Sequence, residues 1–433
     1  MLVLSDIHFD PTANKALVDR LATAEPAQWA SIFATDDTRV SSYGEDTNWK
    51  LLRSTLAAAK VPPQPDVVLV AGDFLVHQFR TRFNAAASAH GDAAFRAFTS
   101  KTMRFLALQL EAAFPATPIL PVLGNNDSDC GDYALRPGGT FLSDTLEVAA
   151  GMIGPEGEAS LRQSWQALGN YVVPNPAVKD HLIAVVNTNF FSANYKNTCG
   201  VASDANPAQA TLAWLRSVLS DAEASALKVW LAYHIPPGID AFATARHEAC
   251  PIAPVTFFAE PYAREFHALM ERYRATVTAS FAGHTHVDGF RLLADDGWAF
   301  GFVMMNPAVS PIFGQNPAFR RVELAEDGTI TDQSVYYLAN LPAAASGAAP
   351  QWRLEMSFDR AWNQSRFDLS SLDALYRRIG SSVAARDRWL DFYAVQGPVR
   401  ATLGPANAAI YRCAAGNDRV VDLTHCSCAS AMR

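Results

Sequence analysis

Short apolar stretches recur along the chain, and each ends in small or polar residues. They read LVLSDIH, DVVLVAGDF, ILPVLGNND, LIAVVNTN, VWLAYHIPPG, TASFAGHTH and GFVMMNPAV, at residues 2–8, 66–74, 119–127, 182–189, 229–238, 278–286 and 301–309. Runs of this length that are rich in Val, Ile and Leu and bounded by turn residues are typical of buried β-strands. The sequence therefore predicts a series of strands that end in Gly, Asn, Asp or His.

Longer stretches with helical spacing separate several of these strands. Three of them are FRAFTSKTMRFLALQLEAAF, AQATLAWLRSVLSDAEA and YAREFHALMERYRA, at residues 95–114, 208–224 and 262–275. Strands that alternate with helices favour parallel or mixed sheets covered on both faces. We therefore predict a layered α/β (α+β) fold.

The C-terminal part changes character. Residues 319–338 alternate like a β-hairpin whose turn is Asp327-Gly328, and residues 341–350 are small residues and prolines without periodicity. Beyond them, aromatic residues at helical intervals and three cysteines predict a small helical subdomain. We therefore expect a catalytic domain over residues 1–340, a linker over 341–350 and a C-terminal helical, cysteine-containing subdomain over 351–433.

Composition narrows the choice of partner. The chain has 433 residues, a formal net charge of -8 and 49% hydrophobic residues. A net acidic chain without a basic run is a poor match for a nucleic-acid duplex or an anionic membrane. No apolar window of about 18 residues predicts a transmembrane segment.

Cysteine usage bears on the compartment. The six cysteines form an even set, and five lie in stretches rich in turn residues, which favours disulfides and an oxidising compartment. The chain enters its first strand directly after Met1, without the features of an export signal. We therefore expect a secreted or periplasmic protein whose signal peptide is not present in this chain; a cytosolic protein with free thiols is the alternative.

The polar residues at the strand ends are the candidate site. They are Asp6, His8, Asp73, Asn125, His234, His284 and His286. Loops at the carboxyl ends of strands in α/β sheets converge on ligands. Carboxylate, imidazole and amide oxygen together suit Zn, Fe or Mn. Each motif alone is more often a turn or a surface pair, so the prediction depends on the whole series.

The series DIH, GDF, GNND, YHIPP and GHTH resembles the calcineurin-like metallophosphoesterase superfamily. More narrowly, SDIHFDP, GDFLVH, LAYHIPPG, AGHTH and NPAVSPIFGQNPAFR resemble the acid sphingomyelinase-like phosphodiesterases. The resemblance implies a β-sandwich flanked by helices and a hydrolase with two divalent metal ions. The ions, Zn or alternatively Mn or Fe, would grip the phosphoryl oxygens and present a bridging hydroxide for in-line attack.

The resemblance also implies the ligand sets. One ion would be held by Asp6, His8, Asp73 and His286. The other would be held by Asp73, Asn125, His234 and His284. Asp73 would bridge the two ions.

One position departs from the superfamily. Most members have a histidine where this chain has Asn126, and an amide cannot protonate a leaving group. His77 matches a family histidine near the leaving group and is our first choice for the acid. The carboxylates Asp127, Asp129 and Asp132 are secondary choices. Alternatively, the substrate is a phosphoanhydride that needs no strong acid, as the GNND motif of endopolyphosphatases suggests.

The same resemblance implies disulfide pairings. Cys199 would pair with Cys250, and Cys413 would pair with either Cys426 or Cys428. The alternative for the tail is a small zinc site that uses His425, although HCSC lacks the usual cysteine spacing.

These observations favour a phosphodiesterase that hydrolyses phosphoester or phosphoanhydride bonds in small substrates, such as nucleotides or phospholipid headgroups. Sphingomyelinases proper carry a saposin-like lipid-extracting domain, and nothing before Asp6 could form one, so soluble substrates are favoured over membrane-embedded lipid. We expect a monomer with at most transient contact with a lipid surface. A non-catalytic phosphate-binding relative is the competing hypothesis, because of Asn126.

Overall fold

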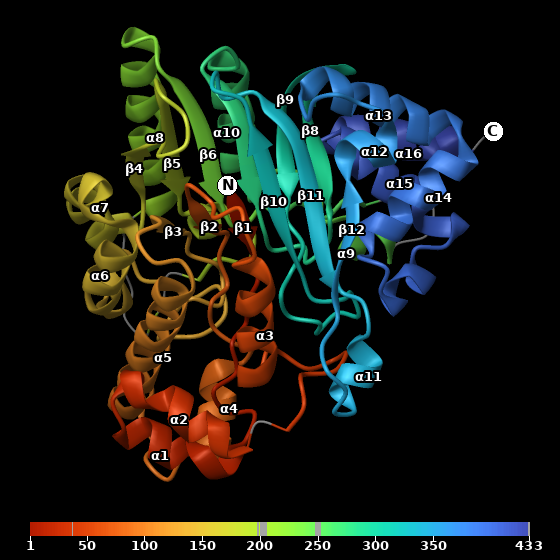
Figure 1. The fold of residues 1–433 in the computed structure, drawn as a ribbon. Helices are drawn as coiled ribbons and strands as arrows, with labels where there is room; N and C mark the ends of the chain where they lie inside the picture. The colour runs from red at the N-terminus through yellow and green to blue at the C-terminus, as the bar shows by residue number, and fades with distance from the viewer. Residues whose placement is uncertain (37, 197–198, 200–205, 247–252, 432–433) are drawn as a thin grey trace.

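Two six-stranded sheets form the centre of the molecule and share one hydrophobic core (Figure 1). The computed structural model describes residues 1–36, 38–196, 199, 206–246 and 253–431. Helices cover the outer faces of the sheets, so the predicted layered α/β fold is confirmed.

The first sheet has the strand order β12-β11-β10-β1-β2-β3. Its strands are β1 (Leu2–Leu4), β2 (Val68–Val70), β3 (Ile119–Pro121), β10 (Ala318–Leu324), β11 (Ile330–Leu338) and β12 (Trp352–Ser357). β1, β2 and β3 are parallel, whereas β10, β11 and β12 pair antiparallel. β1, β2 and β3 are buried throughout, as the continuous apolar runs predict.

The second sheet has the order β4-β5-β6-β7-β9-β8. Its strands are β4 (Tyr171–Pro174), β5 (His181–Val186), β6 (Lys228–Tyr233), β7 (Val277–Ala282), β8 (Gly289–Asp295) and β9 (Trp298–Met305). β5, β6, β7 and β9 are parallel, and β4 and β8 pair antiparallel at the two edges. The parallel strands of both sheets therefore end in loops from which the candidate site is built.

The three helices predicted from spacing are α5 (Asp92–Ala113), α8 (Pro207–Ala224) and α10 (Tyr262–Arg272). The other helices in the N-terminal half are α1 (Val18–Thr23), α2 (Trp29–Phe33), α3 (Trp49–Ala59), α4 (Phe79–Ala86), α6 (Thr140–Ile153) and α7 (Pro155–Leu168), and the short helix α9 (Ala241–Ala245) follows β6. Local sequence sets their starts: Asn206 accepts a bond from the Gln209 amide at the start of α8, with Pro207 as the first helical residue.

The C-terminal part begins with the predicted hairpin, which β10 and β11 form with Asp327-Gly328 in the turn. Residues 341–345 form the short helix α11 (Leu341–Ala345), and β12 then adds an edge strand to the first sheet. The helices α12 (Phe358–Trp362), α13 (Leu369–Ser381), α14 (Val383–Tyr393), α15 (Pro405–Gly416) and α16 (Val420–Ala431) gather on one side of the molecule (Figure 1). The sequence did not predict β12, and the division of the chain into a catalytic domain and a subdomain stays a prediction.

The disulfides correct one expectation and confirm another. Cys199 is bonded to Cys130, so the pairing expected with Cys250 is wrong, and Cys250 itself lies outside the described residues. Cys413 is bonded to Cys426 within the tail, as expected. Cys428 is also disulfide-bonded, so these sulfurs are not available for a zinc site with His425.

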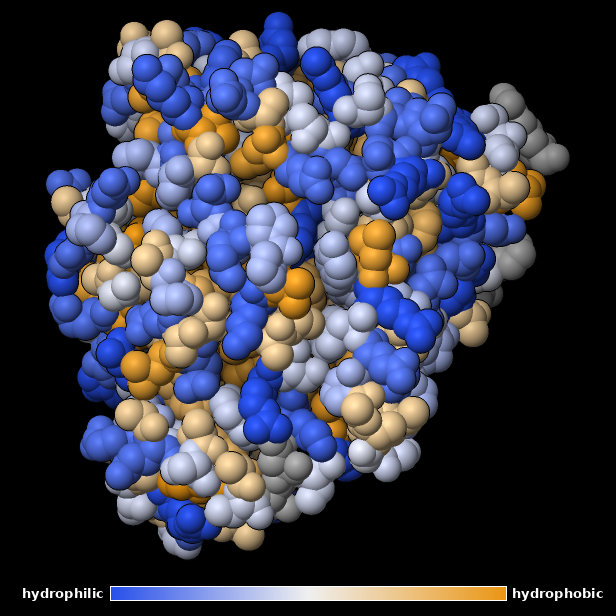
Figure 2. Space-filling model, viewed as in Figure 1, coloured by the Kyte–Doolittle hydropathy of each residue, from blue (hydrophilic) through white to orange (hydrophobic). Residues whose placement is uncertain are grey.

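The surface is polar with scattered hydrophobic residues on the face shown in Figure 2. Among the helices of the described residues, none combines the length and the apolar character needed to cross a bilayer.

Candidate metal centre

The seven candidate ligands converge from both sheets. Asp6 and His8 follow β1, Asp73 follows β2, Asn125 follows β3, His234 follows β6, and His284 and His286 follow β7. All except the half-buried His284 are buried. The convergence arises because all five strands are parallel within their sheets and end at the junction of the two sheets.

One half of the centre is formed by Asp6, His8, Asp73 and His286. The Nε2 atoms of His8 and His286 lie 3.1 Å apart. His8 Nε2 is 3.3 Å from Asp73 Oδ2, and His286 Nε2 is 3.4 Å from Asp6 Oδ1. These four side chains therefore point their donor atoms at one small volume.

The other half shares Asp73. His234 Nε2 lies 3.2 Å from Asp73 Oδ2 and 3.1 Å from Asn125 Oδ1. His284 joins this half, because its ligand atom lies within 4.8 Å of those of Asp73 and His234. Asp73 is thus the residue common to both halves.

Backbone contacts fix which nitrogens face the centre. His8 Nδ1 lies 3.0 Å from the carbonyl oxygen of Leu75, and His234 Nδ1 lies 2.8 Å from that of Ala71. A carbonyl only accepts, so each Nδ1 carries a proton and donates it, and each Nε2 is turned inward. This is the second-sphere arrangement typical of metal-binding histidines.

The inward-facing atoms are carboxylate and amide oxygens and imidazole Nε2 atoms, all of which can coordinate a cation. Asn125 donates through Nδ2 to Asp132 at 2.7 Å, which leaves its Oδ1 facing His234 Nε2. Acceptors this close need a proton or a cation between them. The donor set therefore fits divalent cations of the borderline class.

Charge and burial set the protonation states. Burial lowers the pKa of His8 to about 4 and that of His284 to about 3, so both imidazoles are neutral near pH 7. Burial also works to lower the pKa of His234, but the neighbouring Asp73 raises it to about 9. Burial works to raise the pKa of Asp73, and His234 and His8 hold it well below its usual range.

The backbone at the centre is strained. Asp6, His8, Asp73, His284 and His286 adopt φ between 43° and 71°, in the left-handed region. Each such residue costs of the order of 1 kcal/mol, and such strain clusters where side chains must be aimed. At residue 124 a Cβ atom would collide with the carboxylate of Asp73, which explains the glycine before Asn125.

His77 lies beside the first half of the centre. Its ring stacks on that of His8 with 3.8 Å between centroids, and its Nδ1 lies 3.0 Å from Asp46 Oδ1. Asp46 also accepts a bond from the Ser310 hydroxyl at 2.9 Å. Burial works to lower the pKa of His77, but the bond and charge of Asp46 outweigh it and raise the pKa.

Asn126 hydrogen-bonds to Asp73, and its amide cannot donate a proton to a leaving group as a histidine could. Its backbone N–H donates to Asp73 Oδ1 at 2.8 Å, and its Nδ2 donates to Asp73 Oδ2 at 3.0 Å. Two donors on one carboxylate fix its orientation. The geometry gives Asn126 a positioning role toward the residue shared by the two halves.

The nearby carboxylates have separate contacts. Asp127 is fully buried and accepts backbone N–H bonds from Phe74, Leu75 and Gly124, so it ties the loop after β3 to the loop after β2. Asp132 accepts from Asn125, and Asp129 accepts from the Thr140 hydroxyl.

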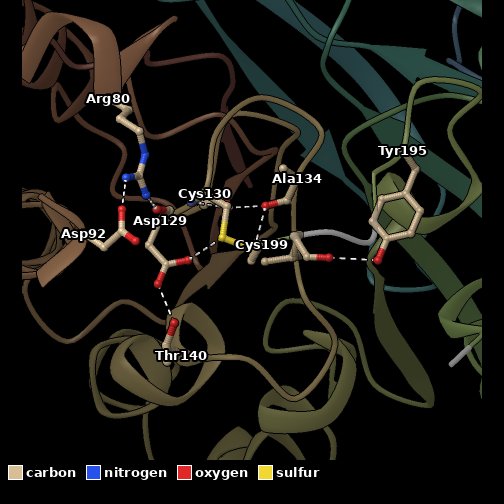
Figure 3. Close-up of a disulfide and its surroundings, with 10 residues drawn as sticks. Arg80, Asp92, Asp129, Cys130, Ala134, Thr140, Tyr195 and Cys199 are labelled. Atoms are coloured by element: carbon tan, nitrogen blue, oxygen red, sulfur yellow. Dashed lines mark hydrogen bonds and ion pairs between the residues drawn. A yellow bond between two sulfur atoms is a disulfide. The ribbon is translucent and has the colours of Figure 1, made fainter. Parts of the chain in front are cut away.

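The disulfide Cys130–Cys199 closes the loop after β3 (Figure 3). Around it, Arg80 donates to the backbone oxygen of Asp129 at 2.6 Å and pairs with Asp92, and Tyr195 donates to the backbone oxygen of Leu135 at 2.8 Å. These contacts fasten the loop that carries Asn125 and Asn126 to α4, to α5 and to the segment after β5.

Sequence reasoning missed several contributing residues. Asp46 contacts His77, and Ser310 in turn donates to Asp46. The Gln315 side-chain amide lies 3.1 Å from His286 Nδ1. The stretch NPAVSPIFGQNPAFR contained two of them, but no spacing rule linked it to the histidines.

Comparison with known families matches residues 1–288 to the calcineurin-like phosphoesterase family. The match covers well over half of the chain, so the protein belongs to the calcineurin-like phosphoesterase family and is a hydrolase of phosphoric esters. The family identified from the motifs is thereby confirmed. Membership implies a pair of divalent metal ions, which the donor set described above fits.

Several curated proteins are similar over most of the chain. Acid sphingomyelinase-like phosphodiesterase 3b of Mus musculus is 25% identical over 408 residues, which cover 90% of this chain and 82% of that protein. Sphingomyelinase phosphodiesterase D of Dictyostelium discoideum is 26% identical over 360 residues, covering 78% and 72%. Cyclic GMP-AMP phosphodiesterase SMPDL3A of Mus musculus is 25% identical over 292 residues, covering 65% and 61%.

Among solved structures, a dimetal phosphatase from Danio rerio matches 77% of this chain and 94% of its own, with 14% identity and a TM-score of 0.38. This similarity is too distant to bear on the site.

Proposed function

We propose that the protein is a metal-dependent phosphodiesterase that hydrolyses phosphoester or phosphoanhydride bonds in small substrates, such as nucleotides or lipid headgroups. Family membership and the names of the similar proteins support the phosphodiesterase class. The observation that carries the proposal is the close approach of possible ligand atoms around Asp73. The Nε2 atoms of His8 and His234 lie 3.3 Å and 3.2 Å from Asp73 Oδ2, and His234 Nε2 lies 3.1 Å from Asn125 Oδ1.

Two ligand sets follow from the two halves of the centre. Asp6, His8, Asp73 and His286 would hold one ion, and Asp73, Asn125, His234 and His284 would hold the other. When bound, two divalent ions, with zinc as the first choice and Mn or Fe as alternatives, would polarise the phosphoryl group and lower the pKa of water. The protein's own share is to keep His8 and His284 neutral and to orient Asp73 through the two donors of Asn126.

His77 is proposed as the proton donor to the leaving oxygen. Its Nδ1 is engaged by Asp46, so its Nε2 is left to hold the transferable proton. The side chain is 23% exposed, in contrast to the fully buried His8 on which it stacks, so a substrate can reach it. A positioned acid of this kind contributes about 10² to 10⁴ in rate.

A second candidate function is hydrolysis of phosphoanhydrides, as in endopolyphosphatases. The observation in its favour is that both donors of Asn126 are directed at Asp73, so this position offers no acid. A departing phosphate has a pKa of about 6 and needs little protonation.

The setting proposed for this activity is a secreted or periplasmic one. Two disulfides among the described residues support an oxidising compartment. A small-molecule substrate, a monomeric protein and no more than transient contact with lipid surfaces complete the proposal.

The test is to load the protein with Zn or Mn, to measure the bound metal, and to compare initial rates on a nitrophenyl diester, on sphingomyelin in detergent and on ATP or polyphosphate. Turnover of sphingomyelin would support His77 as an effective acid. Turnover limited to the activated ester and the anhydrides would support the second function. A protein that binds two ions and cleaves none of these substrates would support the non-catalytic hypothesis.

A further inference from the structure

An exposed aromatic ring stands at the edge of the metal centre. Phe313 lies in the loop between β9 and β10, and 57% of it is exposed, although Ser310, Pro311, Gln315 and Asn316 around it are buried. A lone exposed phenylalanine is ordinary on a protein surface. This ring is unusual because it contacts two histidines of the candidate site.

Phe313 contacts two histidines of the site. Its ring centroid lies 4.7 Å from that of His286 and 5.5 Å from that of His77, with interplanar angles of 62° and 76°. Edge-to-face contacts of this kind fix a ring without covering both of its faces. The ring therefore lies beside the proposed proton donor and keeps a large part of its surface open.

The turn that carries Phe313 is held on both sides. Before it, the Ser310 N–H donates to the Asp6 carbonyl at 3.1 Å, and the Ser310 hydroxyl donates to Asp46. After it, the Gln315 side chain contacts His286 Nδ1 at 3.1 Å and donates to the Ser310 carbonyl at 2.6 Å. Gly314, with φ of 89°, closes the turn through its N–H bond to Pro311.

The C-terminal part braces the same turn. The Val399 N–H donates to the Gly314 carbonyl at 3.1 Å, and Asn316 Nδ2 donates to the Val395 carbonyl at 2.9 Å. The hydroxyl of Tyr43 donates to Asn316 Oδ1 at 2.6 Å. Because these hydrogen bonds hold the turn in place, a ligand could bind to the exposed ring without the entropic cost of ordering a loop.

A flat apolar surface next to a phosphoryl site suits a nucleobase. Stacking of a base on an aromatic side chain contributes about 1 to 3 kcal/mol and tolerates any base. Quaternary ammonium headgroups are typically recognised by aromatic cages, in which several ring faces surround one point. The other rings at the centre, Tyr133 and Phe257, contact His284 in the other half, so Phe313 does not form such a cage with them.

We propose that Phe313 is a stacking platform for the base of a nucleotide substrate and makes nucleotides the preferred substrate class. This inference rests on the proposed function, and it names the substrate of that same site. Phe313 acts here as a specificity-determining residue and takes no part in proton transfer.

The test compares AMP with inorganic phosphate, which share the phosphate but not the base. Dissociation constants for both are measured by calorimetry on the zinc-loaded protein, and the ratio of the phosphate to the AMP constant is the readout. Phe313→Ala should lower this ratio about tenfold, and Phe313→Trp should keep or raise it. Trp298→Ala is the matched control, because Trp298 is 54% exposed and lies at the β8–β9 turn, at the far end of β8 from His286.

Other outcomes overturn the inference. A ratio that stays within twofold of the unaltered protein in Phe313→Ala would show that no base stacks there. Equal weakening of both ligands would show that the ring only positions the histidines. Weakening of phosphocholine in place of AMP would show a cationic occupant. If the unaltered protein turns over the ester substrates, the proposed function stands whichever of these results is found. If the unaltered protein turns over none of the substrates, the proposed function is refuted, independently of the result for Phe313.

Discussion

The loops that follow β2 and β3 leave neighbouring parallel strands and reach the same carboxylate by different means. The loop after β2 supplies Asp73 itself and, four residues later, His77, whose Nδ1 is engaged by Asp46. The loop after β3 supplies Asn125 and Asn126, of which Asn126 donates twice to Asp73. Asp127 joins the loops by accepting N–H bonds from both.

The two loops therefore have different roles at the centre. The β2 loop holds a histidine that titrates, His77, beside the centre. The β3 loop directs the side-chain amides of Asn125 and Asn126, which cannot titrate, at His234 and Asp73. The β3 loop is also closed by a disulfide, and the β2 loop is held by hydrogen bonds. We therefore expect changes at His77 in the β2 loop to affect chemistry and changes in the β3 loop to affect metal binding and stability, whereas Asp73, which belongs to both ligand sets, affects both.

The largest effect is expected from Asp73→Asn. The change removes the one charge shared by both ligand sets, so metal content should fall below two ions and turnover should fall to background. Mutation of residues that only hydrogen-bond to metal ligands already lowers metal affinity by about 10- to 100-fold. Metal analysis and initial rates provide the measurement, with Asp221→Asn on the exposed surface of α8 as control. A fully active Asp73→Asn protein with two ions would refute the site assignment.

His77→Ala should separate substrate classes. Loss of a proton donor should slow substrates with an alkoxide leaving group by about 10² to 10⁴, and anhydrides far less. The measurement is kcat on sphingomyelin and on ATP, and His181→Ala, half-buried on β5, is the control. Equal losses on the two substrates would show that His77 is not the acid.

Removal of the disulfide of the β3 loop should reduce stability. Cys130 and Cys199 are 69 residues apart, so the double change to serine should cost about 4 kcal/mol in the chain-entropy treatment. Cys413 and Cys426 are 13 residues apart, and their removal should cost about 3 kcal/mol. Denaturant unfolding of both variants measures the two losses. A larger loss from the tail pair would contradict this ranking of the two regions.

Asn126→Ala should weaken metal binding and leave the preference between leaving groups in place. One of the two donors to Asp73 is lost, and a hydrogen bond to a charged group contributes about 1.5 to 3 kcal/mol. Titration against a chromophoric chelator should show affinity reduced by at least about tenfold. If Asn126→Ala instead slowed only alkoxide substrates, Asn126 would belong with the acid, and the separation of tasks would be wrong.

Asp46→Asn should give the smallest effect. The amide still accepts a bond from His77 but no longer carries the charge, so kcat on alkoxide substrates should fall about tenfold. KM should stay nearly constant, because Asp46 is buried and lies behind His77. The free energy of unfolding is measured in parallel, because Asp46 also accepts a hydrogen bond from the Ser310 hydroxyl. A change confined to KM would argue against a positioning role.

Much of the fold was predictable because strands and helices leave local patterns. The buried runs of β1, β2, β3, β5, β6, β7 and β9, the spacing of α5, α8 and α10, and the Asp-Gly turn between β10 and β11 were all visible in the sequence. β12 was missed although WRLEMS alternates apolar and polar residues, because it is a single short run between the small residues of 341–350 and the helical patterns of the tail.

The site was only partly predictable, for a different reason. The seven candidate ligands stand at strand ends, and topology brings such ends together. Asp46 and Ser310 lie outside those ends, and the contacts of Asp46 with His77 and with Ser310 depend on packing between distant loops. The cysteine pairing was wrong at Cys199 because sequence position does not report which of several loops lies nearest in space.

The edge strand β12 limits where the chain can be truncated. β12 pairs along β11 from Trp352 to Ser357, and it precedes all the helices of the tail. A chain cut after residue 350 would leave the long strand β11 with an open row of amide and carbonyl groups, which invites pairing with other chains. β12 therefore covers the edge of β11. Because the helices after it bury Phe358, Trp362 and Leu372 in the main hydrophobic core, a soluble fragment should retain these helices as well.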